Sequence, residues 1–387
     1  MKKNELRKES ISIFINLIKT TIGSGILRYP FLFKMYGPWY TIVLTLISAL
    51  ASLFGLWMYI DLNDFYGLDN SMSTIARYIY PPLQNIVNIT VSVKCFLVCI
   101  AYLVLLKNNV PRTVSAIFGM QDEYPNLCIF VIAVCIFPFV VMHRIDKLRY
   151  TSLFGLVAVM ALVASSIAMY AKSGDVVAMQ HTATSNGKLF GELGSFVFGF
   201  TCHQNIFSVQ NEMKTNNKTA LKLTTFLVLG TASLTYIVFG LASYLALGDS
   251  MKENFFENLP DRIRNTVAVF YFFVVMMSIP LQTHPCRTYF LNLFGAKYSA
   301  ERKYRHLRFV TSLFIIAVAL IAAMSVSKME RLCEVIGGSF SALMCFGFAS
   351  VYHFMAFKHR GIEIRKIMPL FVLLYGMAAF ASLFAHP

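Results

Sequence analysis

Charged side chains are scarce in this sequence of 387 residues. Only 14% of the residues are charged, whereas 57% are hydrophobic, and the mean hydropathy is +0.61. This composition excludes a water-soluble globular domain, because such domains carry about 25% charged residues. The 34 basic residues outnumber the 19 acidic ones. They lie in short segments between apolar runs rather than in one basic stretch, so nucleic acid is not expected as a partner.

The sequence also lacks the motifs of metal sites, disulfide frameworks and hydrolases. It has eight cysteines but no Cys-x-x-Cys pair, no His-Glu-x-x-His, no Gly-x-Ser-x-Gly and no paired aspartates inside an apolar run. We therefore expect no metal, no cofactor and no enzymatic activity, which leaves a membrane-embedded enzyme as a remote alternative. The apolar run that follows the polar residues 1–9 continues through Pro30, unlike a cleavable signal peptide.

Long apolar runs dominate what remains. A membrane-spanning helix needs roughly 20 apolar residues, and in hydrocarbon the backbone must satisfy its own hydrogen bonds. The sequence therefore predicts an all-α polytopic membrane protein with about eleven transmembrane helices in a lipid bilayer. The expected spans are 10–35, 38–60, 86–106, 126–142, 150–170, 189–212, 223–247, 266–292, 309–326, 332–356 and 367–385.

Lysine and arginine also predict the orientation. The N-terminus and the even-numbered connections together carry about twice as many of them as the odd-numbered connections do. By the positive-inside rule, the N-terminus is expected in the cytoplasm. Residues 1–9 are then a cytoplasmic segment, and 171–188 form a non-cytoplasmic loop.

Four cationic residues fall inside the expected spans: Lys19, Arg28, Lys94 and Arg287. Ionisable groups at membrane depth are costly and usually face a cavity or a partner. Arg28 and Arg287 lie near span ends, where snorkelling or structural pairing explains them. Lys94 lies near the middle of its span, so a structural and a functional role stay open.

The first span contains Gly23-Ser24-Gly25, which is unfavourable for a continuous helix. An interrupted helix exposes N–H groups at the start of its second half, where the helix dipole favours an anion such as a substrate carboxylate. A packing face of small residues is the alternative.

The sixth span carries a polar block, Thr201-Cys202-His203-Gln204-Asn205, in an otherwise apolar run. Lipid offers these groups no partners, so they should face a cavity. Two interrupted helices five spans apart indicate a five-plus-five inverted repeat with a site near the membrane midplane. The expected repeats are residues 10–170 and 189–356, and residues 357–387 add an eleventh helix and a short C-terminus.

Three motifs in these spans resemble one family. They are Asn-x-x-Lys-x-x-x-Gly-x-Gly-Ile-Leu-x-x-Pro from Asn16 to Pro30, Phe-x-Phe-Thr-Cys-His-Gln-Asn-Ile-Phe-Ser-Val-x-Asn-Glu from Phe198 to Glu212, and Ser-Ile-Pro-Leu-Gln-x-His-Pro-Cys-Arg from Ser278 to Arg287. The chain resembles the amino acid/auxin permease family, and within it the fungal vacuolar amino-acid transporters. The resemblance implies a leucine-transporter-like fold and secondary active transport of amino acids, by alternating access, across a vacuolar, endomembrane or plasma membrane.

The resemblance also implies a substrate site at the two interruptions. Residues of the first span would hold the amino-acid backbone, and residues of the sixth would face it: Thr21, Ile22, Gly23, Ser24, Gly25, Thr201, Cys202, His203 and Asn205.

Coupling is expected to be independent of sodium. Sodium-coupled relatives carry Asn where Lys19 stands and use a hydroxyl of the eighth helix, here matched by Ser278, so the Lys19 ammonium would replace the sodium ion. Snorkelling of Lys19 is the alternative. His203 is a candidate proton carrier because imidazole titrates near neutral pH, and capping the broken sixth helix is its structural alternative.

The expected function is therefore amino-acid transport driven by protons or by exchange. The charges at membrane depth favour neutral substrates and, if Lys94 faces the cavity, acidic ones. A non-transporting amino-acid sensor of the same fold is the alternative, and the short polar ends of the chain argue against it.

Overall fold

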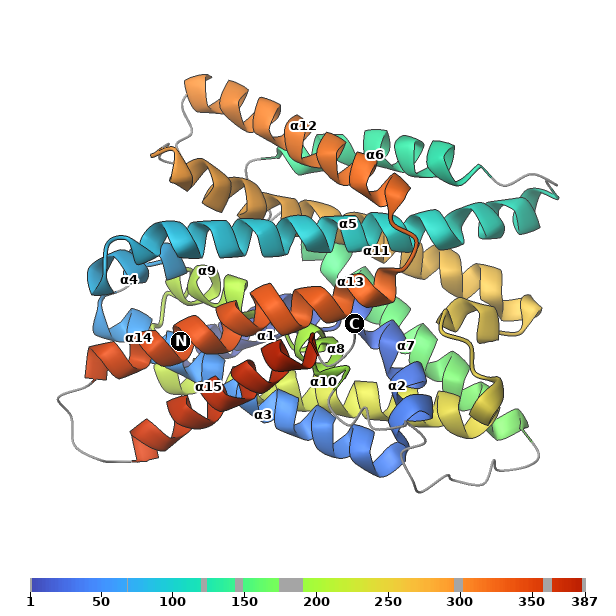
Figure 1. The fold of residues 1–387 in the computed structure, drawn as a ribbon, viewed down its shortest axis with the longest axis horizontal. Helices are drawn as coiled ribbons and strands as arrows, with labels where there is room; N and C mark the ends of the chain where they lie inside the picture. The colour runs from blue at the N-terminus through green and yellow to red at the C-terminus, as the bar shows by residue number, and fades with distance from the viewer. Residues whose placement is uncertain are drawn as a thin grey trace.

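The computed structural model of the chain describes residues 2–67, 69–119, 124–142, 149–173, 191–295, 302–357 and 364–384. All regular secondary structure in these ranges is helical (Figure 1). The predicted all-α class is therefore confirmed.

Each of the eleven expected spans is mainly helical. Five of these spans are long single helices: α3 (Pro38–Phe65), α5 (Leu83–Phe118), α10 (Lys218–Leu247), α11 (Asp261–Leu293) and α12 (Arg302–Ser325). Three further spans are also single helices: α6 (Pro125–Val141), α7 (Arg149–Lys172) and α15 (Ile364–Ser382). The connections add α4 (Met72–Ile79) and the short turns η4 (Gly248–Ser250) and η5 (Phe255–Asn258).

The other three spans are interrupted. The first consists of α1 (Lys2–Thr21), η1 (Ser24–Arg28) and α2 (Tyr29–Tyr36). The sixth consists of α8 (Leu193–Gly199), η3 (His203–Asn205) and α9 (Ile206–Asn211). The tenth consists of α13 (Met329–Ile336), the π-helical turns η6 (Gly337–Ser341) and η7 (Leu343–Gly347), and α14 (Phe348–Phe357).

Length and apolar composition support a multi-span membrane protein. Within the described ranges, seven helices are long and apolar enough to cross a membrane, or eight if the bent pair Glu5–Thr21 and Ser24–Tyr36 counts as one span. The apolar helices α6 and α15 are shorter. Large apolar side chains such as Leu234 on α10 and Ile321 on α12 are exposed, as expected of surfaces that face lipid.

The expected N-terminal segment 1–9 is not separate from the first helix, because α1 already begins at Lys2. Residues 2–9 contain no helix breaker, so nothing stops the helix from extending beyond the apolar run. Glu9 accepts hydrogen bonds from the backbone N–H of Lys214 (3.1 Å) and the hydroxyl of Thr215 (2.5 Å), which tie α1 to the segment before α10. Most of the expected loop 171–188 lies outside the described residues.

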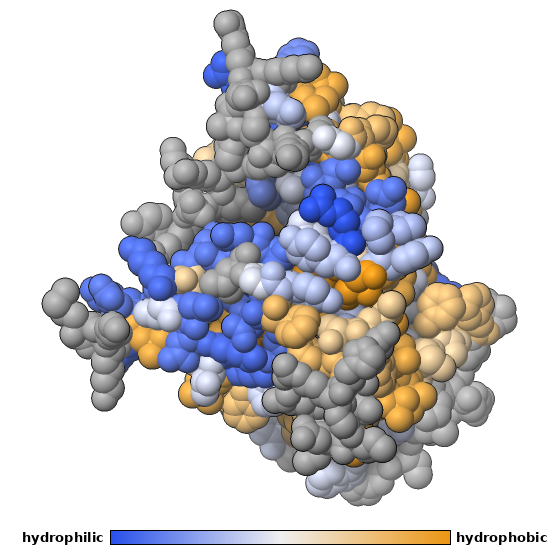
Figure 2. Space-filling model, turned by 90° about the vertical axis from the view of Figure 1, so that its left-hand side faces the viewer, coloured by the Kyte–Doolittle hydropathy of each residue, from blue (hydrophilic) through white to orange (hydrophobic). Residues whose placement is uncertain are grey.

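The helices run roughly along the long axis of the molecule (Figure 1). Helix α5 extends over most of this length and packs along α11. Helices α6 and α12 lie on one side of α5, and α3, α10 and α15 lie on the opposite side of the bundle. Figure 2 shows hydrophilic residues gathered on the end that carries α4 and the start of α5, as expected where a membrane protein meets water.

Arg287 has a structural place in this bundle. It is 0% exposed, and its guanidinium donates to the carbonyl oxygens of Val140 (3.0 Å) and Met142 (3.3 Å) and to the hydroxyl of Ser312 (2.6 Å). These bonds connect α11 to the end of α6 and to α12. Of the two explanations expected from the sequence, pairing rather than snorkelling applies to Arg287.

Candidate functional site

The first span breaks at the predicted glycines. The last backbone bond of α1 runs from Ile22 N to Ile18 O (2.8 Å), and the chain bends by 45° before η1 continues it. Ser24 and Gly25 are buried, and no side chain caps the start of η1. The backbone N–H groups at this start are thus available to an anion inside the bundle.

The sixth span breaks within its polar block. Helix α8 ends at Gly199, the next three residues form no helix, and η3 begins at His203. Thr201 donates through its hydroxyl to Val197 O (2.9 Å), and its side chain meets the Cys345 sulfur at 4.0 Å. The break predicted from the polar residues is therefore present.

The two breaks adjoin each other. A Cβ added to Gly25 would lie 3.0 Å from the Cα of Gly199, so a side chain there would press against the backbone of the sixth span. The Asn205 amide donates to the Thr20 hydroxyl (2.9 Å) and joins η3 to the end of α1. The breaks of the first and sixth spans are therefore in contact inside the bundle, although they lie far apart in the sequence.

Tyr236 of α10 joins the two broken ends, which the sequence did not indicate. Its hydroxyl lies 2.9 Å from the carbonyl oxygen of Thr21 and 2.6 Å from that of Gly199. One hydroxyl proton is shared between these two carbonyls, each at the end of a half-helix. The ring of Tyr236 stacks on Tyr29 at 4.3 Å. No signal in the sequence separates this tyrosine from others in apolar spans.

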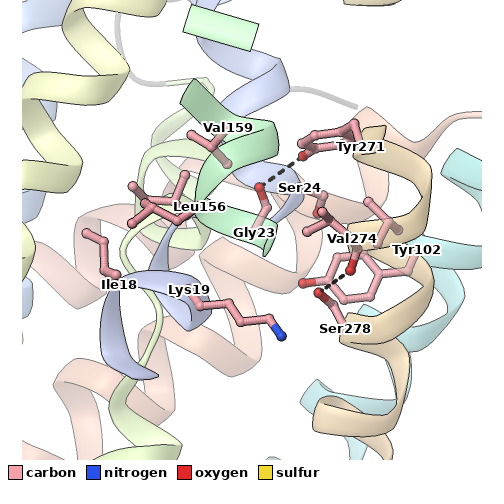
Figure 3. A pocket seen from close by; sticks show the side chains of 13 residues that line it. Ile18, Lys19, Gly23, Ser24, Tyr102, Leu156, Val159, Tyr271, Val274 and Ser278 are labelled. Carbon is pink, nitrogen blue, oxygen red and sulfur yellow. Dashed lines mark hydrogen bonds between the residues drawn. The ribbon is translucent and has the colours of Figure 1, made fainter. Parts of the chain in front are cut away.

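Lys19 and Ser278 line one small cavity next to the first break, together with Ile22, Gly23 and Ser24. Figure 3 shows the Lys19 side chain extending from α1 toward Ser278 on α11. The structure thus brings together the two residues expected to act in coupling. The Ser278 hydroxyl donates to Val274 O (2.8 Å), so its oxygen can still accept a hydrogen bond.

This cavity is too small for an amino acid. Its volume is about 20 Å³. One water molecule needs about 10 to 15 Å³ on this scale. Tyr271 and Tyr102 form part of its wall, and the Tyr271 hydroxyl donates to Gly23 O (3.1 Å). An amino acid can enter only after these walls move.

His203 lies outside the lining of that cavity, against α3. Its Nε2 is 3.1 Å from the carbonyl oxygen of Ser52, and because a carbonyl only accepts, Nε2 is the donor. The other ring nitrogen, Nδ1, is buried and has no partner among the residues that the structure describes. Gly55 makes room for the ring, since a Cβ there would lie 2.8 Å from His203 Nε2.

Arg28 is paired and does not snorkel. Its two terminal nitrogens lie 2.7 Å from Glu192 and 2.7 Å from Glu253, and the residue is 6% exposed. Glu192 also accepts from the Ser195 hydroxyl (2.6 Å). This cluster ties η1 to the start of α8 and to the segment before η5.

The π-helical turns of the tenth span were missed by the sequence prediction, which expected a regular helix over 332–356. Their first turn packs on α8, where a Cβ added to Gly337 would lie 1.8 Å from the carbonyl oxygen of Gly194. The pair Gly337-Gly338 was the available signal. Such turns interrupt the regular hydrogen-bond ladder and are frequent at functional sites.

A family model and several known proteins match most of this chain. The model of the family described as transmembrane amino acid transporter protein matches residues 8–386. The chain is similar to vacuolar amino acid transporter 5 of Schizosaccharomyces pombe, with 28% identity over 364 residues that cover 90% of this chain and 84% of that protein. It is also similar to vacuolar amino acid transporter 5 of Saccharomyces cerevisiae, with 27% identity over 72% of this chain and 66% of that protein.

Two solved structures share the fold. Mhp1, a nucleobase-cation-symport-1 family transporter in a closed conformation, matches with a TM-score of 0.64 and 12% identity over 97% of this chain and 92% of that one. MhsT in complex with L-phenylalanine matches with a TM-score of 0.63 and 12% identity over 96% of this chain and 98% of that one. The expected leucine-transporter-like architecture is therefore confirmed at the level of the fold.

Proposed function

The chain belongs to the family of transmembrane amino acid transporter proteins, and from that premise we propose that it is a sodium-independent secondary transporter of neutral and acidic amino acids. Transport is driven by protons or by exchange, across a vacuolar or other membrane, with the N-terminus in the cytoplasm. One observation carries this proposal: the broken first span puts uncapped N–H groups and the Lys19 cavity side by side.

The substrate carboxylate binds at the start of η1 in this proposal. Three features support it: the absence of a side-chain cap, the burial of Ser24 and Gly25, and a buried Ser24 hydroxyl without a partner in the described residues. The dipole of the second half-helix adds to the attraction for an anion. In the same proposal, Thr201, Cys202, His203 and Asn205 face the amino-acid backbone from the sixth span.

Alternating access follows from contacts at the two ends of the bundle. On one side, Arg28 pairs with Glu192 and Glu253, and the Lys34 ammonium donates to the carbonyl oxygens of Asp249 (2.8 Å) and Met251 (3.0 Å). On the other side, Glu9 binds the segment before α10. We propose that these two sets of contacts break in turn, because the cavity between them is closed in this structure.

Reconstitution in liposomes tests the proposed function. Uptake of a panel of labelled amino acids is measured with sodium, with choline in its place, and with and without a proton gradient. Uptake is expected to be equal in sodium and choline. Loss of uptake in choline would contradict the role assigned to Lys19, and absence of any amino-acid uptake or exchange would contradict transport itself.

Basic amino acids are expected to compete poorly. Lys19 and Lys94 put positive charge at membrane depth, and Glu192 and Glu253 already pair with Arg28. In competition against labelled glutamine, excess neutral or acidic amino acids should inhibit uptake strongly, whereas lysine and arginine should not. The reverse order would show that an available carboxylate faces the substrate.

A further inference from the structure

A buried lysine without a counter-charge lies beside the two breaks. Lys94 sits one third of the way along α5 and is 2% exposed. Among the residues that the structure describes, no ion pair and no hydrogen bond involves its ammonium group. An ammonium offers three donors and a full charge, and burying it unpaired inside a membrane protein is costly.

Helix geometry directs Lys94 to the interior of the bundle. Leu105, eleven residues or about three turns further along α5, shares the same face. Leu105 lines a cavity of about 50 Å³ with Leu27 and Arg28 of the first span. The Lys94 face of α5 is therefore the one turned toward the first span.

Lys94 is also close to the sixth and tenth spans. Helix α5 packs against α13 and against the π-helical turns η6 and η7 of the tenth span. The electrostatic effect of the Lys94 charge extends to Cys202 and His203 at the sixth-span break and to Cys345 in η7. Cys345 of η7 in turn meets the Thr201 side chain at the sixth-span break, with 4.0 Å between its sulfur and the Thr201 hydroxyl oxygen. The helix that carries Lys94 therefore reaches the sixth-span break through the tenth span.

We propose that Lys94 binds the side-chain carboxylate of an acidic amino acid and so determines which substrates the transporter prefers. This inference rests on the proposed function, in which the α-carboxylate of the same substrate binds at the start of η1. An acidic side chain supplies the counter-charge that the described residues around Lys94 lack, and the resulting bond is charge-assisted. A neutral side chain leaves the ammonium unpaired.

The Nδ1 atom of His203 has no hydrogen-bond partner among the described residues, which supports the proposal that a ligand binds at the sixth-span break. With Nε2 donating to Ser52, Nδ1 of the neutral ring is an acceptor, and it is 0% exposed on a ring that the Lys94 charge reaches. His203 Nδ1 is thus a buried acceptor without a partner, and the Lys94 side chain also makes no hydrogen bond with a described residue. Buried polar groups are normally satisfied, so this region is built for a polar molecule.

The test compares uptake of labelled glutamate and glutamine by the full chain in liposomes. The wild type should favour glutamate. Lys94→Met should lower the glutamate-to-glutamine uptake ratio by about 10- to 100-fold, as expected for the loss of one charge-assisted bond, and keep glutamine uptake. Lys94→Arg should restore part of the ratio.

Lys107→Met is the matched control on the same helix. The Lys107 ammonium donates to the carbonyl oxygens of Ala323 (2.7 Å) and Val326 (2.5 Å) at the end of α12, so unlike Lys94 it already has partners. Its loss should leave the ratio unchanged.

Three outcomes would overturn the role of Lys94: wild-type uptake of glutamine without glutamate, an unchanged ratio in Lys94→Met, or a folded Lys94→Met protein that transports neither substrate. All three leave amino-acid transport itself intact, because the wild type still carries an amino acid, and the first of them removes only the acidic substrates from the proposed function. Only a wild type that carries none contradicts both.

Discussion

Gly25→Val should abolish amino-acid uptake. The valine side chain would cover the N–H groups at the start of η1, where we propose that the substrate carboxylate binds. It would also meet the sixth span, since a Cβ at Gly25 lies 3.0 Å from the Cα of Gly199 and 3.4 Å from Phe198. The measurement is uptake of labelled glutamine in liposomes, accompanied by size-exclusion chromatography and circular dichroism to verify folding.

Gly230→Val is the control for this prediction. Gly230 also lies in a membrane helix, α10, but a Cβ there would meet no atom within 4 Å, so uptake should stay near wild type. Gly25→Ala adds the smallest side chain and should retain part of the uptake if the contact with Gly199 adjusts. A folded Gly25→Val protein with wild-type uptake would show that the carboxylate binds elsewhere.

Lys19→Asn should lower sodium-free uptake by about 10-fold or more, and sodium should restore part of it. The substitution removes the ammonium from the cavity that Lys19 shares with Ser278 and leaves an amide that can help to bind a cation (Figure 3). The measurement is uptake by the variant in choline and in sodium, at equal protein content per liposome.

Lys8→Asn makes the same change on the same helix at an exposed position, so uptake should keep its wild-type value in both salts. Sodium-insensitive, wild-type uptake by Lys19→Asn would instead favour the snorkelling alternative for Lys19.

Sequence was sufficient to predict the features that depend on local composition. The spans follow from apolar runs, and both helix breaks follow from residues poorly suited to a helix in hydrocarbon: Gly23 and Gly25 in one span and the Thr201–Asn205 block in the other. Lys19 and Ser278 could be paired only through the family resemblance, and the structure puts them on one cavity.

Features that depend on distant partners could not be predicted. Arg28 pairs with Glu253, which is 225 residues away, and no periodicity indicates that contact. Tyr236 reaches two half-helices from a third span. Apolar helices of this kind show only weak periodicity, so their sequence does not indicate which face is turned inward.

The close approach of Gly194 and Gly337 has a mechanical consequence. At these two glycines the backbones of α8 and the tenth span meet directly, since a Cβ at either one would overlap the opposite backbone. Two backbones in such direct contact resist both sliding and separation, as small residues permit the tightest helix packing. We therefore expect the first half of the sixth span and the middle of the tenth to move as one rigid unit. If the contacts of Arg28 break as proposed, α8 and the first π-helical turn are expected to move together.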